Sequence, residues 1–301
     1  MTVALRVATD AEKRARDLVT FAEWGSRLTL PQYLERELKL RSHPWARRAM
    51  TTWFLADGDE VLASCETFRN DSTVGQTPGA SFAVASVFTE VARRGKGHAA
   101  KLMSSLVARL RESPDAQSSV LFSDVGAPIY EKSGYRAVPA WDWVLPPLDA
   151  PLAAQWLEAP VAAPPRLGAQ GQLTLHPSAE QLDWHYERSR IYARLLGRPA
   201  LTHYGARTAD GTAWWTAQFK SDELIVLWLD APDAAAAEPL LRAAQLQAHR
   251  AGLPRVRVWE TFSLANIAGA QRTPRDGELP MVAALNATFT QWRRIERALW
   301  V

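Results

Sequence analysis

Residues 87–110, VFTEVARRGKGHAAKLMSSLVARL, constrain the fold more than any other segment of the chain. An apolar run ends at a turn that contains two glycines flanked by arginine and lysine, and apolar residues between Leu102 and Leu110 then recur at helical spacing. The first N–H groups of a helix have no intrahelical partner and, together with the helix dipole, they attract anions. The turn lacks the spacer of a P-loop and the third glycine of a dinucleotide fingerprint. The residues therefore predict either a phosphate-binding turn outside those two classes or a solvated basic turn that merely begins a helix.

The apolar patterns around this segment predict an α/β domain. Expected helices cover residues 11–19 and 30–40, expected strands cover 51–56, 60–68 and 80–90, and a strand at 118–124, a short helix at 127–135 and a closing strand at 137–145 follow the basic turn. The turn DGDE between the first two strands is typical of a hairpin. This order predicts a sheet with antiparallel and parallel neighbours around one right-handed β-α-β crossover.

Composition narrows the class of protein. The chain has 301 residues, of which 47% are hydrophobic and 22% charged, which is enough for two folded domains. The net charge of +3 is spread along the chain, so no nucleic-acid partner is expected. The single cysteine, Cys65, lies in an apolar run and is expected to be a buried hydrophobe and not a nucleophile. The charged N-terminal segment does not resemble a signal peptide and no run reaches membrane-spanning length, so no membrane partner and a cytoplasmic location are expected.

Two motifs resemble those of the GCN5-related N-acetyltransferase (GNAT) superfamily. RGKGHA, residues 94–99, resembles its Arg-x-x-Gly-x-Ala pyrophosphate loop, and IYEKSGY, residues 129–135, resembles the segment that follows its next strand. EWGSRLTLPQYLERELKL, SCETF and, in the second half, WHYERSRIYARLLGRPALTHYGA are similar to fungal lysine N6-acetyltransferases. The resemblance implies an acyl-CoA N-acyltransferase fold, acetyl-coenzyme A (acetyl-CoA) as co-substrate, and acetyl transfer to a primary amine by direct attack. No metal is expected, because His176, His185, His203 and His249 do not have the spacing of metal ligands. Free lysine, as in lysine degradation, is one candidate acceptor.

The resemblance also implies which residues bind the co-substrate and act on it. The expected cofactor-binding residues are Val87, Phe88, Thr89, Arg93, Arg94, Gly95, Lys96, Gly97, His98 and Ala99. The strand residues would hydrogen-bond the pantetheine arm and the thioester, as an edge strand accepts an added strand. Tyr130 corresponds to the tyrosine that protonates the coenzyme A sulfur, and a simple packing role is the alternative. Glu90 is the carboxylate best placed in sequence to act as a base, although a carboxylate that merely precedes the loop fits equally well.

A lysine acceptor would need carboxylates for its ammonium groups and an arginine for its carboxylate. Glu35, Glu37 and Glu66 are candidates for the acidic side, with a solvated helix face as the alternative for the first two. Val301 is a further candidate, because some two-lobed acetyltransferases direct the terminal carboxylate to the acceptor; a tail that only covers a groove is the alternative. None of the 29 arginines stands out as the carboxylate ligand.

The second half repeats the β-β-β-α-β order of the first half without the Arg-x-x-Gly-x-Ala loop. This pattern predicts a catalytic domain at residues 1–148, a Pro/Ala-rich linker at 149–171 and a degenerate GNAT-like domain at 172–301 that does not bind coenzyme A. Residues 288–299, TFTQWRRIERAL, are expected to form a helix. Alternatives are an acetyltransferase for protein, polyamine or aminoglycoside amines, and a non-catalytic acyl-CoA sensor. The sequence does not predict an oligomeric state.

Overall fold

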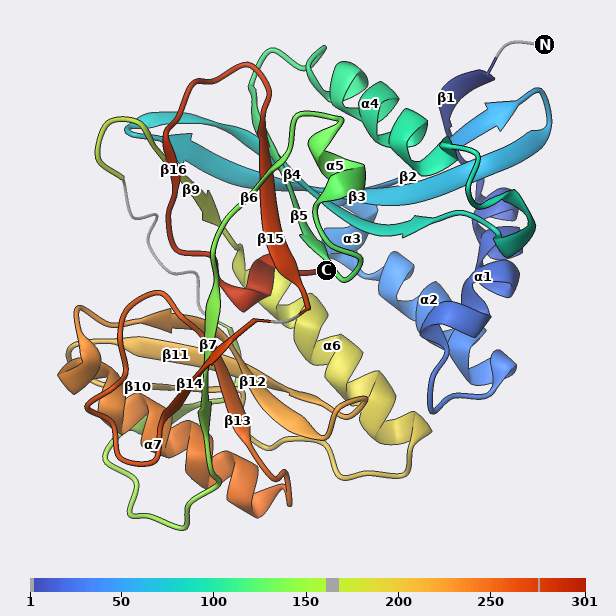
Figure 1. Ribbon diagram of the computed structural model, residues 1–301. Helices are drawn as coiled ribbons and strands as arrows, with labels where there is room; N and C mark the ends of the chain where they lie inside the picture. Colours follow the sequence, from blue (N-terminus) through green and yellow to red (C-terminus); the bar gives the residue numbers. More distant parts are fainter. Residues whose placement is uncertain (1–2, 161–167, 276) are drawn as a thin grey trace.

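The computed structural model describes residues 3–160, 168–275 and 277–301, which form two β-sheets with helices on their faces (Figure 1). The first half contains β1 (Val3–Val7), α1 (Asp10–Trp24), α2 (Leu30–Ser42), α3 (Pro44–Ala49), β2 (Met50–Asp57), β3 (Glu60–Val74), β4 (Thr77–Phe88), η1 (Val91–Arg93), α4 (His98–Leu110), β5 (Ala116–Ser123), α5 (Pro128–Glu131), β6 (Arg136–Ala137) and β7 (Trp141–Leu145). The second half contains β8 (Gln155–Leu157), β9 (Gln172–His176), α6 (Ala179–Leu195), β10 (Gly205–Arg207), β11 (Thr212–Gln218), β12 (Glu223–Asp230), α7 (Ala234–Arg250), β13 (Val256–Trp259), β14 (Gln271–Pro274), β15 (Leu279–Ala284), β16 (Gln291–Trp292) and η2 (Arg297–Leu299). The expected α/β class is confirmed.

The first sheet is organised around the predicted crossover. Its strands run in the order β1-β2-β3-β4-β5-β15-β6, and β9 pairs with the far end of β3. β4 and β5 are parallel, and α4 connects them across one face of the sheet (Figure 1). The periodic apolar residues of α4, Leu102, Met103, Leu106, Val107 and Leu110, are all buried there. The expected right-handed crossover segment thus places the start of α4 at the ends of β4 and β5.

The helix α1 has a polar buried face. Its start is fixed by a capping box, in which the Glu12 amide donates to the Thr9 hydroxyl at 3.3 Å and the Thr9 amide donates to the Glu12 carboxylate at 2.8 Å. Arg16 and Asp17 are buried, whereas Leu18 is 54% exposed. Because a charged residue is buried only when it is paired or serves a site, this orientation indicates a polar interior beside α1.

The second sheet has the order β14-β7-β13-β12-β11-β10-β8. β12 and β13 are parallel and α7 connects them, so the β-β-β-α-β order expected for residues 172–301 is confirmed. α7 packs on one face, and α6 lies between the two sheets (Figure 1). The fully buried Trp214 and Trp215 lie in the core of this lobe. Trp184 and Trp292 instead belong to a second core with Phe68 and Val120 of the first sheet, so the tryptophans of the second half pack both within this lobe and against the first sheet.

The two sheets exchange strands across the expected linker. The expectation of one closing strand at 137–145 is wrong, because only β6 stays in the first sheet, whereas β7 pairs with β13 and β14 in the second. The buried carboxylate of Asp142 in β7 contributes to this position, since it pairs with Arg257 at 2.9 Å and with Arg275 at 2.8 Å. In return, β15 inserts between β5 and β6. The expected division at residues 149–171 therefore does not match the membership of the sheets.

The C-terminal segment is not the expected helix. β16 pairs with β9, and the short turn η2 follows. The carbonyl of Ala298 is bonded by the Gln181 side chain at 2.8 Å and lies 2.9 Å from Nε2 of His185, both on α6. These contacts hold the segment against α6 between the sheets, where a continuous helix would lose the pairing with β9.

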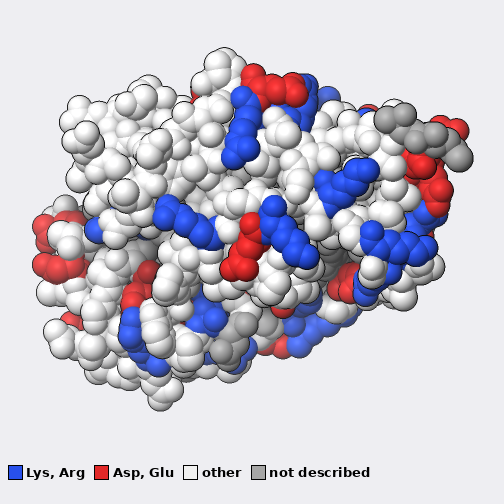
Figure 2. Space-filling model, turned by 45° about the horizontal axis from the view of Figure 1, so that its top comes forward, with Lys and Arg blue, Asp and Glu red and all other residues white. Residues whose placement is uncertain are grey.

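The charged side chains are mixed on the surface, and the described residues contain neither a membrane-spanning helix nor a metal-binding cluster. On the face in Figure 2, Lys and Arg side chains are interspersed with Asp and Glu and do not form a continuous basic surface. Over residues 3–160, 168–275 and 277–301, no helix is long and apolar enough to cross a membrane, and no group of three His, Cys, Asp or Glu is arranged to hold a metal ion.

Candidate active site

A β-bulge in β4 opens the first sheet. Ser64 of β3 lies opposite Phe88, whereas Glu66 lies opposite Ala85, so β4 has one extra residue and Ser86 adopts a φ of +54°. The parallel register between β4 and β5 ends at the Val84–Leu121 pair. The last residues of β4 therefore diverge from β5 and leave backbone groups available to a ligand between the two strands.

The basic turn before α4 lies at the same end of the sheet. Gly95 and Gly97 have φ values of +79° and +78°, and a Cβ on either glycine would meet no atom within 4 Å. The N-cap residue of α4, Gly97, has no side chain that could bond the first helical N–H groups. By contrast, Asp233 caps α7 in the second lobe by accepting from the Ala236 amide at 3.0 Å. Only the α4 end of these two crossovers presents an open, uncapped N-terminus.

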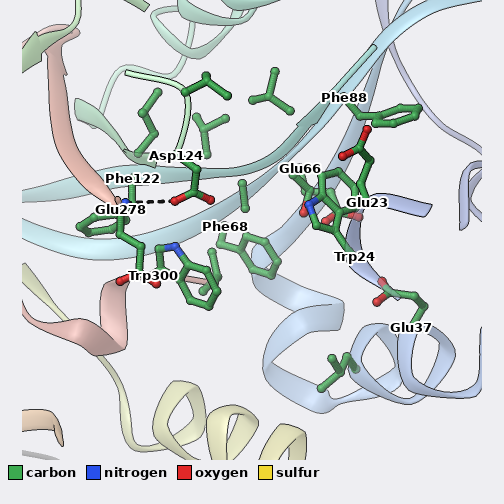
Figure 3. Close-up of a pocket in the computed structure, with 18 of the residues that line it drawn as sticks. Glu23, Trp24, Glu37, Glu66, Phe68, Phe88, Phe122, Asp124, Glu278 and Trp300 are labelled. Carbon is green, nitrogen blue, oxygen red and sulfur yellow. Dashed lines mark hydrogen bonds between the residues drawn. The ribbon is translucent and has the colours of Figure 1, made fainter. Parts of the chain in front are cut away.

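One cavity of about 1140 Å³ joins the bulge, the turn and the space between the lobes. Its walls come from α1, α2, β3, β4, the start of α4, α5, α6 and the C-terminal segment. Figure 3 shows Glu66, Glu23 and Trp24 on one side and Asp124, Glu278 and Trp300 on the other, with Phe68 between them. The Asp124 carboxylate accepts from the Glu278 amide at 3.0 Å. The cavity is large enough for two small reactants to bind side by side.

Glu66 is the buried carboxylate of this cavity. Arg16 from α1 pairs with it at 3.1 Å, and donates to the Ser64 hydroxyl at 2.8 Å and to the Ser86 carbonyl at 2.7 Å. Burial raises the pKa of Glu66, and the charge of Arg16 opposes that rise. Arg16 thus connects the carboxylate directly to the bulge.

Tyr130 lines the cavity from α5, next to the apolar core of the first lobe. Burial raises its pKa to about 12, so the hydroxyl keeps its proton at neutral pH. Cys65 is fully buried, and burial raises the pKa of its thiol to about 12 as well. The thiol is therefore neither ionised nor accessible, as expected from the sequence.

The structure brings most of the predicted site residues to this cavity. The lining includes Val87, Phe88, Thr89, Arg93, Arg94, Gly95, Gly97, His98, Ala99, Tyr130, Glu66 and Val301, as well as Glu37. The structure does not bring Glu90, Lys96 or Glu35 to it. Glu90 is exposed at the start of η1, and Lys96 is exposed in the turn. Glu35 bonds Arg194 at 2.6 Å and Lys39 at 3.1 Å on the surface, because α2 turns this side chain outward.

Sequence reasoning missed several lining residues, among them Arg16, Trp24, Arg188, Glu278 and Trp300. The polar face of α1 offers one signal for Arg16, because a helix whose leucine and valine point outward must place polar groups inward. Glu278 and Arg188 carry no such local signal. They reach the cavity through the strand exchange and through the position of α6 between the lobes.

Comparison with protein families matches both halves of the chain. Residues 32–138 match the domain described as "Acetyltransferase (GNAT) domain", and residues 150–280 match the "LYC1 GNAT-like C-terminal domain". The chain belongs to the GNAT superfamily. Both of its lobes are of GNAT type.

Individual relatives agree with the family. A lysine acetyltransferase of Yarrowia lipolytica is 27% identical over 149 residues, which cover 46% of this chain and 37% of that protein's length. A probable N-acyltransferase of Enterococcus faecalis superposes with a TM-score of 0.60 at 14% identity, over 95% of this GNAT chain and 73% of the other. A GCN5-related N-acetyltransferase of Kribbella flavida superposes with a TM-score of 0.56 at 16% identity, over 94% of this chain and 72% of the other. The two structures are similar to this chain in fold.

Proposed function

We propose that this GNAT enzyme transfers the acetyl group of acetyl-CoA directly to a primary amine in a ternary complex, with the side-chain amine of free lysine as the acceptor. The observation that carries the proposal is the continuous cavity that joins the open start of α4, the bulge of β4 and a buried carboxylate. The lysine assignment is supported by the match to a lysine acetyltransferase.

The turn before α4 would bind the pyrophosphate of acetyl-CoA. Arg94 now pairs with Glu23 and donates to the Thr89 carbonyl at 3.0 Å, and Arg93 pairs with Glu60. Binding of the pyrophosphate would draw these guanidinium groups toward the uncapped helix end, where the oxygens accept from backbone N–H groups. The pantetheine arm would then lie along Val87, Phe88 and Thr89, in the gap that the bulge opens beside β5.

The chemistry requires a neutral amine, an oxyanion site and an acid for the leaving thiolate. The amine nitrogen forms a bond to the thioester carbon, and the carbon–sulfur bond breaks as the tetrahedral intermediate collapses. The proton lost by the amine passes to Glu66, directly or through water, and Tyr130 supplies a proton to the sulfur. Glu66 suits this role because burial raises its pKa toward the working range of a base.

A covalent acyl-enzyme is not part of the proposal. Cys65 is the cysteine of the chain, and its thiol is buried, with its pKa raised to about 12. Direct attack therefore fits the nucleophiles available in the cavity better than a two-step exchange.

The proposal is tested by thiol release from acetyl-CoA in the presence of lysine, ornithine, spermidine or an aminoglycoside. We expect release with lysine, intersecting lines in double-reciprocal plots, and acetylation at the side-chain nitrogen by mass spectrometry. Parallel lines would contradict direct attack, and release with spermidine or the aminoglycoside alone would contradict the acceptor. No release with any amine would leave a binding or sensor protein as the better explanation.

The co-substrate site has its own test in Gly97→Glu. The new carboxylate would project beside the helix end and repel the pyrophosphate, so we expect acetyl-CoA affinity to be lost in calorimetry. Gly252→Glu is the matched control, because Gly252 also has a positive φ and open space at its Cβ but does not line the cavity. Equal acetyl-CoA affinity in the two folded variants would refute the assignment of the turn.

A further inference from the structure

The arginines that line the cavity differ in their ion pairs. Six of them, Arg16, Arg36, Arg41, Arg93, Arg94 and Arg297, each have a carboxylate within 4.0 Å. Arg188 has no hydrogen bond and no ion pair with any residue in the described parts of the chain. It is therefore the lining arginine whose charge a bound anion would complement.

Arg188 is held by aromatic rings in place of acids. Its guanidinium carbon lies 5.0 Å from the ring centre of Trp300 and 5.8 Å from that of Trp184. Burial lowers the pKa of Arg188 and the charge of Arg36 adds to the effect, whereas Tyr192, Glu37 and Glu278 oppose it. A partly buried guanidinium without a direct ion pair is incompletely compensated in the protein alone, so an anionic ligand that pairs with it gains affinity.

The side of the cavity opposite Arg188 carries a carboxylate, that of Glu66. Glu66 lies beside the bulge, and in Figure 3 it is separated from Trp300, the ring partner of Arg188, by the middle of the cavity. Glu278 lies on the Trp300 side, with its carboxylate 4.0 Å from Arg297. The cavity thus offers a carboxylate at the reacting end, and a cation with a neighbouring carboxylate at the far end.

We infer that Arg188 binds the carboxylate of the acceptor, and that the enzyme selects amines that carry an α-amino acid group at their far end. The inference rests on the proposed function and specifies the substrate class of the same site. The acceptor's carboxylate pairs with Arg188, its α-ammonium group faces Glu278, and its side-chain amine extends toward Glu66 and the bulge. Diamines and aminoglycosides lack the carboxylate and would leave Arg188 unpaired.

The test compares lysine with lysinamide, which keeps both amines and lacks the negative charge. We expect the unmodified enzyme to prefer lysine by about 10- to 100-fold in kcat/KM, mainly through KM, because the contact lies away from the reacting atoms. Arg188→Gln should raise the KM for lysine and remove most of this preference, while acetyl-CoA affinity stays unchanged. Arg190→Gln is the matched control, because Arg190 lies on the same helix, pairs with Asp183 and Glu187, and does not line the cavity.

The outcomes separate this inference from the proposed function. Equal use of lysine and lysinamide by the unmodified enzyme would overturn the inference and leave acetyl transfer standing. Absence of transfer to any amine would overturn the proposed function. Calorimetry with lysine and with lysinamide would then show whether the protein binds lysine more tightly, as carboxylate binding by Arg188 requires. If Arg188→Gln does not fold, the same question is answered by Arg188→Lys and by the ratio of kcat/KM for lysine to that for lysinamide in the unmodified enzyme.

Discussion

Replacement of Arg16 by methionine tests the link between the fold and the site. The methionine keeps an apolar stem of similar length, but it removes the ion pair to Glu66 and the hydrogen bonds to Ser64 and to the Ser86 carbonyl. Breaking a buried pair by removing one partner costs about 3–5 kcal/mol, because the remaining charge stays buried without compensation. We expect a loss of this size in the free energy of unfolding at pH 8.

The loss should depend on pH in a defined direction. Burial raises the pKa of Glu66 and Arg16 lowers it, so removal of Arg16 raises the folded-state pKa further above the unfolded value of about 4.3. The folded variant then binds a proton more tightly than the unfolded chain. Its stability is greatest below the unfolded pKa and falls as the pH rises through the folded pKa. At pH 5 the loss in the free energy of unfolding should shrink to about 1–3 kcal/mol, which is the contribution of the missing hydrogen bonds.

Urea unfolding at pH 5 and pH 8 measures the loss in the free energy of unfolding at each pH. Arg14→Met is the control, because Arg14 is exposed on the same helix. The double variant Arg16→Met/Glu66→Gln should lose this added pH dependence, since residue 66 no longer has a carboxyl group to titrate. A loss below about 1 kcal/mol at pH 8, or a pH dependence that survives in the double variant, would refute the description of Glu66 as a buried carboxylate paired with Arg16.

Three other predictions follow from the same structure. Tyr130→Phe should lower kcat by about 10²-fold with little change in acetyl-CoA affinity, and the ratio to the unmodified enzyme should stay flat from pH 7 to 9 because the pKa of Tyr130 is about 12. A steep change in that ratio would argue against it. Iodoacetamide at pH 8 should leave activity intact, because the Cys65 thiol is buried and its pKa is raised to about 12; rapid inactivation with labelling of Cys65 would contradict this. Residues 1–148 expressed alone should not fold cooperatively, as judged by urea unfolding, because β9 and β15 of the first sheet are missing; a sharp transition would show that the first lobe is autonomous.

Local patterns were sufficient to predict the elements near the basic turn before α4. The spacing of the apolar residues in α4, the glycines before it and the segment around Tyr130 all depend on neighbours within one crossover, and the structure places them together. The expected hairpin of β2 and β3 and the crossover through α7 have the same local origin.

The remaining parts of the site depend on contacts between residues far apart in the chain. Arg16 meets Glu66 only after α1 packs against the sheet. β7 joins the second sheet, where Asp142 pairs with Arg257 and Arg275, which follow more than a hundred residues later. The helix expected at residues 288–299 failed for a similar reason, since pairing of β16 with β9 outweighs the helical pattern. No short-range periodicity encodes such partners.

The second lobe has no open anion site at its crossover, but it contributes to the first sheet and to the cavity. The α7 end is closed by the Asp233 carboxylate, so this lobe offers the co-substrate no uncapped helix end comparable to that of α4. It nevertheless provides β15 to the first sheet, and α6 and the C-terminal segment to the wall of the cavity. The wall that carries Arg188, Glu278 and Trp300 is thus built by the lobe with the capped crossover, while the lobe with the open crossover supplies the turn and the bulge. Under the proposed function, changes in the second lobe would therefore alter the choice of acceptor without touching the turn and the bulge, and the Arg188 variants test this expectation directly.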